Sequence, residues 1–113
     1  MRIPSDAIMP IEKLFQYLLV LKQQDDKSKF LAQAGFTLEN WEALLSEIRS
    51  LAKSAEAIED RTNEYGTFYR VDGELRGVNG VNLAVRTIWL QRELDKQFQF
   101  MTLKPRKESQ RDA

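Results

Sequence analysis

The chain has 113 residues, of which 42% are hydrophobic and 30% are charged, and it contains no Cys and no His. This length and composition predict one soluble domain with its own core, without a disulfide framework, a thiolate zinc site or a Ser-His or Cys-His catalytic site. The 17 basic and 17 acidic residues cancel, so no overall field would draw the protein to nucleic acid or to an anionic membrane.

The N-terminal residues carry no targeting signal that we recognise. The stretch MRIPSDAIMPIEK lacks the apolar core of a signal peptide, and the run from Tyr17 to Leu21 is too short to span a bilayer. We therefore expect a cytoplasmic protein with no membrane partner.

The first half of the chain has the spacing of helices. Pro10 suits a first helical position, and apolar residues then recur at helical intervals up to Lys22, which predicts a helix over residues 10–22. Asp25 or Asp26 can cap a short second helix that ends at Gly35.

The third predicted helix has the clearest pattern. It begins after Thr37 or Asn40, either of which can cap it, and ends between Lys53 and Ala55. Its apolar residues form one stripe: Trp41, Leu44, Leu45, Ile48, Leu51 and Ala52.

After Ala57 the hydrophobic period changes to two, which is typical of strands. The predicted strands are residues 56–61, 67–75, 83–90 and 98–103, with Pro105 ending the last one. Gly73 is interpreted as a bulge inside the second strand, and Asn79-Gly80 as the tight turn before the third.

These elements predict an α+β fold in which two or three N-terminal helices pack on a three- to four-stranded antiparallel sheet, a meander. Residues 1–105 would form the single domain and residues 106–113 a flexible basic and polar tail. Both faces of the strand 83–90 carry apolar residues, so we expect it to be central and covered on both sides.

The charges are unevenly distributed. Residues 54–74 hold six acidic and two basic residues, whereas residues 82–107 hold six basic and two acidic ones. Pairing of these charges across neighbouring strands is the preferred interpretation, because it needs no partner. A basic final strand that follows a phosphate backbone is the alternative.

No motif predicts a cofactor or a metal. The glycines between Gly66 and Gly80 match no phosphate-binding pattern, and Asp25-Asp26 is followed by no further acid at the spacing of a calcium loop. The remaining chemistry depends on Lys, Arg, Tyr, Thr and Glu, which suffices for RNA cleavage by attack of its own 2′-hydroxyl.

A sheet face bearing Arg86, Thr102 and Lys104, with Tyr65 or Tyr69 nearby, could carry that reaction. The aromatic residues of the last two strands, Trp89, Phe98 and Phe100, are interpreted as core in preference to a base-stacking platform. Two further interpretations are structural: Lys27 and Lys29 are solvated helix residues, and Lys13 pairs with Asp26.

The order of several segments carries a resemblance. KLFQYLL, DDKSKFLAQAGFTLENWEALL, YGTFYRVDGELRGVNG, VRTIWL and FMTLKP together resemble an uncharacterised small bacterial domain family, largely cyanobacterial, with related modules in polymorphic toxins and toxin–antitoxin-like gene pairs. The resemblance covers residues 1–105 and implies the same fold and a toxin-like module similar to small metal-independent ribonucleases. The positions that match the family are Lys13, Asp26, Lys27, Gly35, Asn79, Gly80, Thr87, Trp89 and Thr102.

Two functional hypotheses follow. The favoured one is an interaction module that pairs, through an exposed strand or helix face, with a small protein encoded by a neighbouring gene. The alternative is a ribonuclease acting on RNA, and a homo-oligomer is a further candidate assembly. The candidate catalytic residues are Lys13, Asp26, Lys27, Arg86, Thr87, Thr102 and Lys104.

Overall fold

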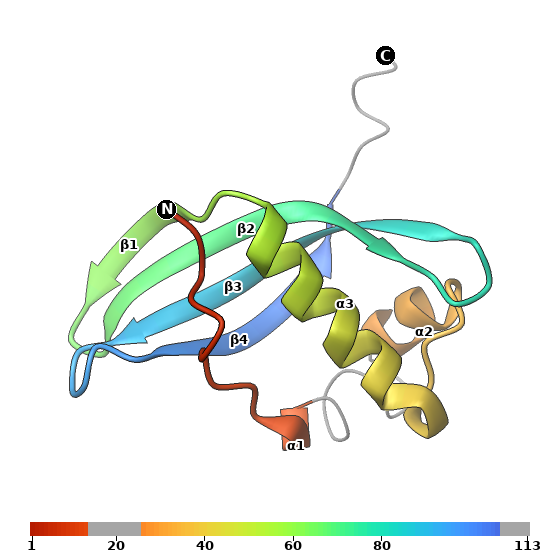
Figure 1. The fold of residues 1–113 in the computed structure, drawn as a ribbon, viewed down its shortest axis with the longest axis horizontal. Coiled ribbons are helices and arrows are strands. Elements are labelled where there is room, and N and C mark those ends of the chain that lie inside the picture. The colour runs from red at the N-terminus through yellow and green to blue at the C-terminus, as the bar shows by residue number, and fades with distance from the viewer. Residues whose placement is uncertain (14–25, 107–113) are drawn as a thin grey trace, which may run out of the picture.

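The computed structural model describes residues 1–13 and 26–106, and its main feature is a four-stranded sheet with helices against one side (Figure 1). In chain order the elements are α1 (Ile11–Lys13), α2 (Asp26–Ala32), the 3-10 turn η2 (Leu38–Asn40), α3 (Trp41–Ser54), β1 (Ile58–Asn63), β2 (Gly66–Arg76), β3 (Asn82–Arg92) and β4 (Phe98–Pro105).

The sheet is an antiparallel meander in the order β1-β2-β3-β4. The longest pairing joins β2 to β3 without interruption, from Gly66 opposite Arg92 to Arg76 opposite Asn82. The register shifts between Glu59 and Arg61 on the outer strand, and between Ile88 and Trp89 where β3 meets β4. The predicted meander and the central position of the strand 83–90 are confirmed.

Among the described residues, α3 makes the most extensive helix contact with the sheet. The α3 stripe buries Leu44, Ile48, Leu51 and Ala52, as its helical spacing predicts. The core combines this stripe with apolar residues from β2, β3, β4 and the N-terminal segment. Asn40 secures the start of α3, because its side chain accepts the Thr37 N–H at 2.8 Å and donates to the Gly35 carbonyl at 2.8 Å.

The predicted arrangement of two or three N-terminal helices packed on the sheet is wrong, although the class is α+β. The first nine residues form no helix: they contain a turn at Ser5 and Asp6, and Ile8 forms a parallel bridge with Gln99 of β4. The Ile8 N–H donates to the Phe98 carbonyl at 2.8 Å, and the Phe100 N–H donates to the Ile8 carbonyl at 2.9 Å. The N-terminal segment thus pairs with part of the β4 edge.

The helix predicted over residues 10–22 is helical at Ile11–Lys13, and its remainder lies outside the described residues. The helix with an extensive contact to the sheet is α3, which directly precedes the strands. Within the described residues, no helix is long and apolar enough to cross a membrane.

The bulge predicted at Gly73 is also wrong, because Gly73 lies opposite Val85 in an unbroken register. A Cβ atom at Gly73 would lie 2.3 Å from Cδ1 of Leu51. The missing side chain therefore lets α3 approach the sheet closely.

The tight turn falls one residue earlier than predicted. The Gly80 N–H donates to the Gly77 carbonyl at 3.3 Å, so Val78 and Asn79 occupy the centre of the turn. The loop is fastened to the end of α2, since the Val78 N–H donates to the Ala34 carbonyl at 2.9 Å. This hydrogen bond between distant segments holds Val78 in its place in the turn.

Candidate functional site

The two faces of the sheet differ in what covers them. Along β3 the residues Leu83, Val85, Thr87 and Trp89 are buried beneath α3, whereas Ala84, Arg86 and Ile88 are half-buried on the other side. Leu90 is buried too, but it does not belong to the core cluster. In the described part of the chain the second side is thus less completely buried than the first, and the prediction that both sides are covered stays a prediction.

We call this second side the open face. The strand register places on it the following side chains: Arg61 of β1, Phe68, Arg70, Asp72, Glu74 and Arg76 of β2, Arg86, Ile88 and Leu90 of β3, and Thr102 and Lys104 of β4.

The apolar part of the open face lies where β1, β2 and β3 are adjacent. Phe68 is the direct cross-strand neighbour of Leu90, and Ile88 is the next residue of β3 on the same side. The Arg61 guanidinium lies 4.6 Å from the centre of the Phe68 ring, close enough for a cation–π contact. An aromatic and two aliphatic side chains thus form one row edged by an arginine.

Asp72 and Arg86 form a two-point ion pair on the same face. Arg86 Nε donates to Asp72 Oδ1 at 2.8 Å, and its NH2 group donates to Oδ2 at 3.1 Å. Burial opposes ionisation of Asp72, but the Arg86 hydrogen bonds and charge, with smaller contributions from Arg106 and Arg70, hold its pKa below the ordinary value. The same hydrogen bonds raise the pKa of Arg86. At this position the predicted pairing of charges across strands is confirmed.

Arg70 is the unusual residue of this surface. It lies opposite Ile58 of β1 and Ile88 of β3. Its Nε atom is buried and has no hydrogen-bond partner in the structure. A buried donor without an acceptor costs roughly 1–3 kcal/mol. An acceptor supplied by a bound molecule would recover that cost if binding moved the side chains that cover this atom.

Several residues predicted from the sequence meet at the β3–β4 side of the open face. Arg86 lies opposite Lys104, and Ile88 lies opposite Thr102. Lys27 of α2 joins them, because its Nζ donates to Thr102 Oγ1 at 2.9 Å. The structure therefore brings Lys27, Arg86, Thr102 and Lys104 together.

The other predicted residues are not part of this group. Thr87 is fully buried under α3, where its Oγ1 donates to the Val71 carbonyl at 2.9 Å and accepts from Trp89 Nε1 at 2.9 Å. Tyr69 contacts the Phe98 ring on the core side, and Tyr65 lies exposed in the β1–β2 turn. The side chains of Lys13 and Asp26 lie outside the described residues.

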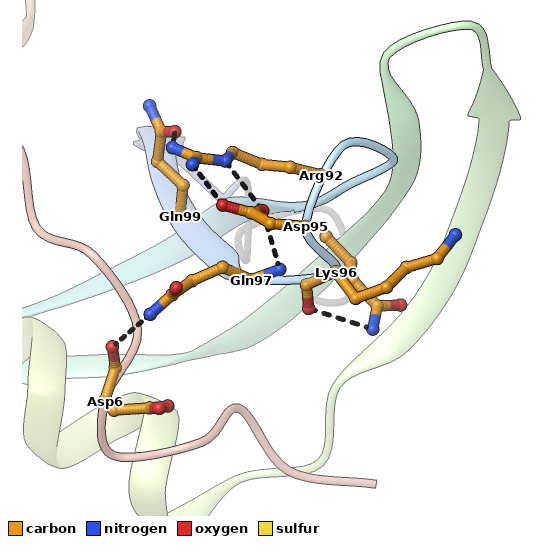
Figure 2. A network of polar contacts seen from close by, with 7 residues as sticks. Asp6, Arg92, Asp95, Lys96, Gln97 and Gln99 are labelled. Carbon is orange, nitrogen blue, oxygen red and sulfur yellow. Dashed lines mark hydrogen bonds and ion pairs between the residues drawn. The ribbon is translucent and has the colours of Figure 1, made fainter.

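A polar network holds the β3–β4 turn (Figure 2). Arg92 Nε donates to Asp95 Oδ1 at 3.1 Å, and the Gln97 backbone N–H donates to the same oxygen at 3.1 Å. The Gln97 side chain reaches the Asp6 carbonyl at 3.4 Å, which ties the turn to the N-terminal segment. We assign this network a structural role, because its members bond to one another and to backbone.

A metal site in this chain would depend on carboxylates, because the sequence has no His and no Cys. In residues 1–13 and 26–106 no three Asp or Glu side chains gather in a group that could hold a metal ion.

Comparison with known proteins places the chain in a family. A family model matches residues 4–107. The chain belongs to the family described as Domain of unknown function (DUF6883). No curated protein sequence matches it.

The fold of this DUF6883 domain has a solved counterpart. It resembles a chain of the contact-dependent growth inhibition toxin–immunity protein complex from Klebsiella pneumoniae 342, with a TM-score of 0.67 and 15% identity. The likeness covers 88% of this chain and 100% of the other. At that identity it establishes the shared fold, and the fold agrees with the toxin-related resemblance noted in the sequence. The cyanobacterial origin stays a prediction.

Sequence analysis missed three residues of the open face of this DUF6883 domain: Arg61, Phe68 and Arg70. The signal was present in the stretch Phe68–Asp72, where the even positions carry Phe, Arg and Asp and the odd positions Tyr and Val. Strand alternation assigns the even positions to one face. Which face α3 covers depends on contacts between distant segments, which alternation alone does not reveal.

Proposed function

We propose that the protein is an interaction module whose open face binds a small protein, encoded beside it, that presents acidic side chains. The likeness to a chain from a toxin–immunity protein complex supports a protein partner as the class of ligand. Because a likeness at 15% sequence identity shows only that the fold is shared, the proposal rests on the residues of the open face.

The observation that carries the proposal is the buried Nε of Arg70, which lacks an acceptor beside a half-exposed apolar row. Aromatic and arginine side chains are enriched in protein interfaces and dominate their hot spots. Phe68 with Arg61 over its ring, next to Arg70, supplies that combination. A carboxylate of the partner would bind the basic groups beside the apolar row, and it would accept the hydrogen bond of Arg70 Nε once the side chains that cover this atom move aside.

Charge supports an acidic partner. The open face carries the basic residues Arg61, Arg70, Arg76, Arg86 and Lys104 and the acidic residues Asp72 and Glu74. Asp72 is already bound to Arg86 at two points, so it offers little to a basic partner. Acidic groups opposite Arg61, Arg70 and Lys104 would speed association and set the orientation.

RNA is a weaker match to the same surface. Of the predicted phosphate-contacting groups, Arg86 is engaged by Asp72 and Lys27 donates to Thr102. A phosphate would have to displace both contacts.

The test is a calorimetric titration with the purified protein of the adjacent gene. Arg61→Glu and Lys104→Glu should each weaken binding by about tenfold or more, because each replaces an attraction by a repulsion at the interface. Lys29→Glu makes the same charge change at an exposed position of α2 and should bind like wild type.

Thermal melts of all three variants verify that they are folded. Wild-type affinity in both Arg61→Glu and Lys104→Glu would refute the open face as the binding surface. RNA cleavage by the purified protein, lost in Arg86→Ala and Thr102→Ala, would replace the interaction module by the ribonuclease.

A further inference from the structure

A pocket of about 530 Å³ lies on the opposite side of the molecule, between the N-terminal segment and α3. Figure 1 shows this segment running beside the helix in front of the sheet. The volume is in the range of sites for small molecules. Its polar lining consists of three basic residues and three serines: Arg2, Ser5, Ser46, Arg49, Ser50 and Lys53.

Most of these polar groups come from one stripe of α3. Ser46, Arg49, Ser50 and Lys53 follow one another at intervals of three, one and three residues, which places them on the same side of a helix. Arg49 NH1 donates to the Ser5 carbonyl at 3.3 Å, so its guanidinium reaches across to the N-terminal segment. The remaining donors of that guanidinium stay available to a ligand.

The charge in the pocket is of one sign. Arg2, Arg49 and Lys53 line it, and no acidic residue is among its lining residues in the described structure. Glu56 lies nearby, but its carboxylate accepts a hydrogen bond from the Met1 amino group at 2.6 Å. That hydrogen bond and charge, with a smaller contribution from Arg2, lower the pKa of Glu56. The Glu56 carboxylate is therefore engaged by the Met1 amino group.

The floor of the pocket is apolar. Ile3, Ala7, Ala52 and Trp89 contribute to it, and each is buried in the core. The Trp89 indole N–H is already donated to Thr87, so the ring offers only apolar surface. The pocket combines an apolar floor with cationic and hydroxyl donors above it.

We infer that this pocket binds a small organic anion whose apolar body rests over Trp89. Its charged group would be held by Arg49, Lys53 and Arg2, with the serine hydroxyls as further donors. This site is independent of the proposed partner surface, because it lies on the α3 side of the sheet.

The test uses two fluorescent probes of similar shape. Anilinonaphthalene sulfonate carries one negative charge, and N-phenyl-1-naphthylamine is the uncharged counterpart. The sulfonate should bind the folded wild type, with an affinity that falls as salt rises. The double variant Arg49→Gln/Lys53→Gln should bind the sulfonate about tenfold more weakly, which corresponds to about 0.7 kcal/mol for each of the two solvent-screened charge contacts. Its binding of the neutral probe should be unchanged.

Two control variants isolate the charge effect. Lys29→Gln with Arg76→Gln removes the same charge from exposed positions outside the pocket and should match wild type. Arg49→Lys keeps the charge and should retain most of the sulfonate affinity. No sulfonate binding to wild type, equal binding by the Arg49→Gln/Lys53→Gln variant, or an equal loss for both probes would overturn the inference.

Discussion

Thr87→Val is expected to destabilise the protein through one buried contact. Thr87 is fully buried, and its hydroxyl is the acceptor for the indole N–H of Trp89 at 2.9 Å. Valine has nearly the same shape, so the change leaves a buried indole donor without a partner while creating little cavity. Such an unpaired donor costs about 1–3 kcal/mol. In a domain of this size each kcal/mol lowers Tm by about 4–6 °C, so we expect a drop of about 4–18 °C.

Thermal and urea unfolding of four variants measure this effect: Thr87→Val, Thr87→Ser, Trp89→Phe and the double variant Thr87→Val/Trp89→Phe. Thr87→Ser keeps the hydroxyl and loses one methyl group, so it should cost only about 1 kcal/mol. Thr87→Val combined with Trp89→Phe removes both hydrogen-bonding groups, and its destabilisation should be smaller than the sum of the single changes. A Thr87→Val protein as stable as wild type would refute the assigned role of the hydroxyl. Partner binding well below Tm should be unchanged, because Thr87 lies on the covered side of the sheet.

Three further outcomes are expected. Gly73→Ala places a Cβ 2.3 Å from Leu51 Cδ1 and should lower the free energy of unfolding in urea by about 1–3 kcal/mol. The cost should be smaller in a Leu51→Ala background, and equal costs in both backgrounds would contradict the close approach of α3. Ile3→Ala should lower the free energy of unfolding by about 2–4 kcal/mol, because Ile3 is buried in the core; a change near zero would mean that the N-terminal segment is not packed there. Burial of Asp72 opposes its ionisation, but Arg86 lowers its pKa below the ordinary 3.8. Wild type should therefore be more stable than Asp72→Asn above about pH 4, and this difference in stability should vanish as the pH falls through the lowered pKa. A stability difference independent of pH would argue against that pair.

The predictions from sequence succeeded where local spacing decides the outcome. The α3 stripe and the alternation along β3 each follow from side-chain direction in a helix or a strand. The core positions of Trp89, Phe98 and Phe100 agree with the same alternation, and all three side chains are buried. Simple alternation would put Thr102 and Lys104 on the same face as Phe100, and the register shift between Ile88 and Trp89 is what places them beside Arg86.

The errors concern contacts between distant segments. Nothing local in residues 1–9 shows that Ile8 pairs with β4, because the partner lies about ninety residues away. A glycine in a strand is equally consistent with a bulge and with a close approach, and only the position of Leu51 separates the two at Gly73. The open face and the α3 pocket depend in the same way on which side of the sheet the helix covers.

The most direct test of the open face is methyl NMR of the protein titrated with the product of the adjacent gene. Ile88 and Leu90 lie on this face, and their methyl signals should shift at the stoichiometry of the complex. Those of Leu44 and Ile48, which belong to α3 and are buried between this helix and the sheet, should stay in place. Shifts confined to the exposed residues Leu38 and Val78, with Ile88 and Leu90 unchanged, would show that the partner binds elsewhere.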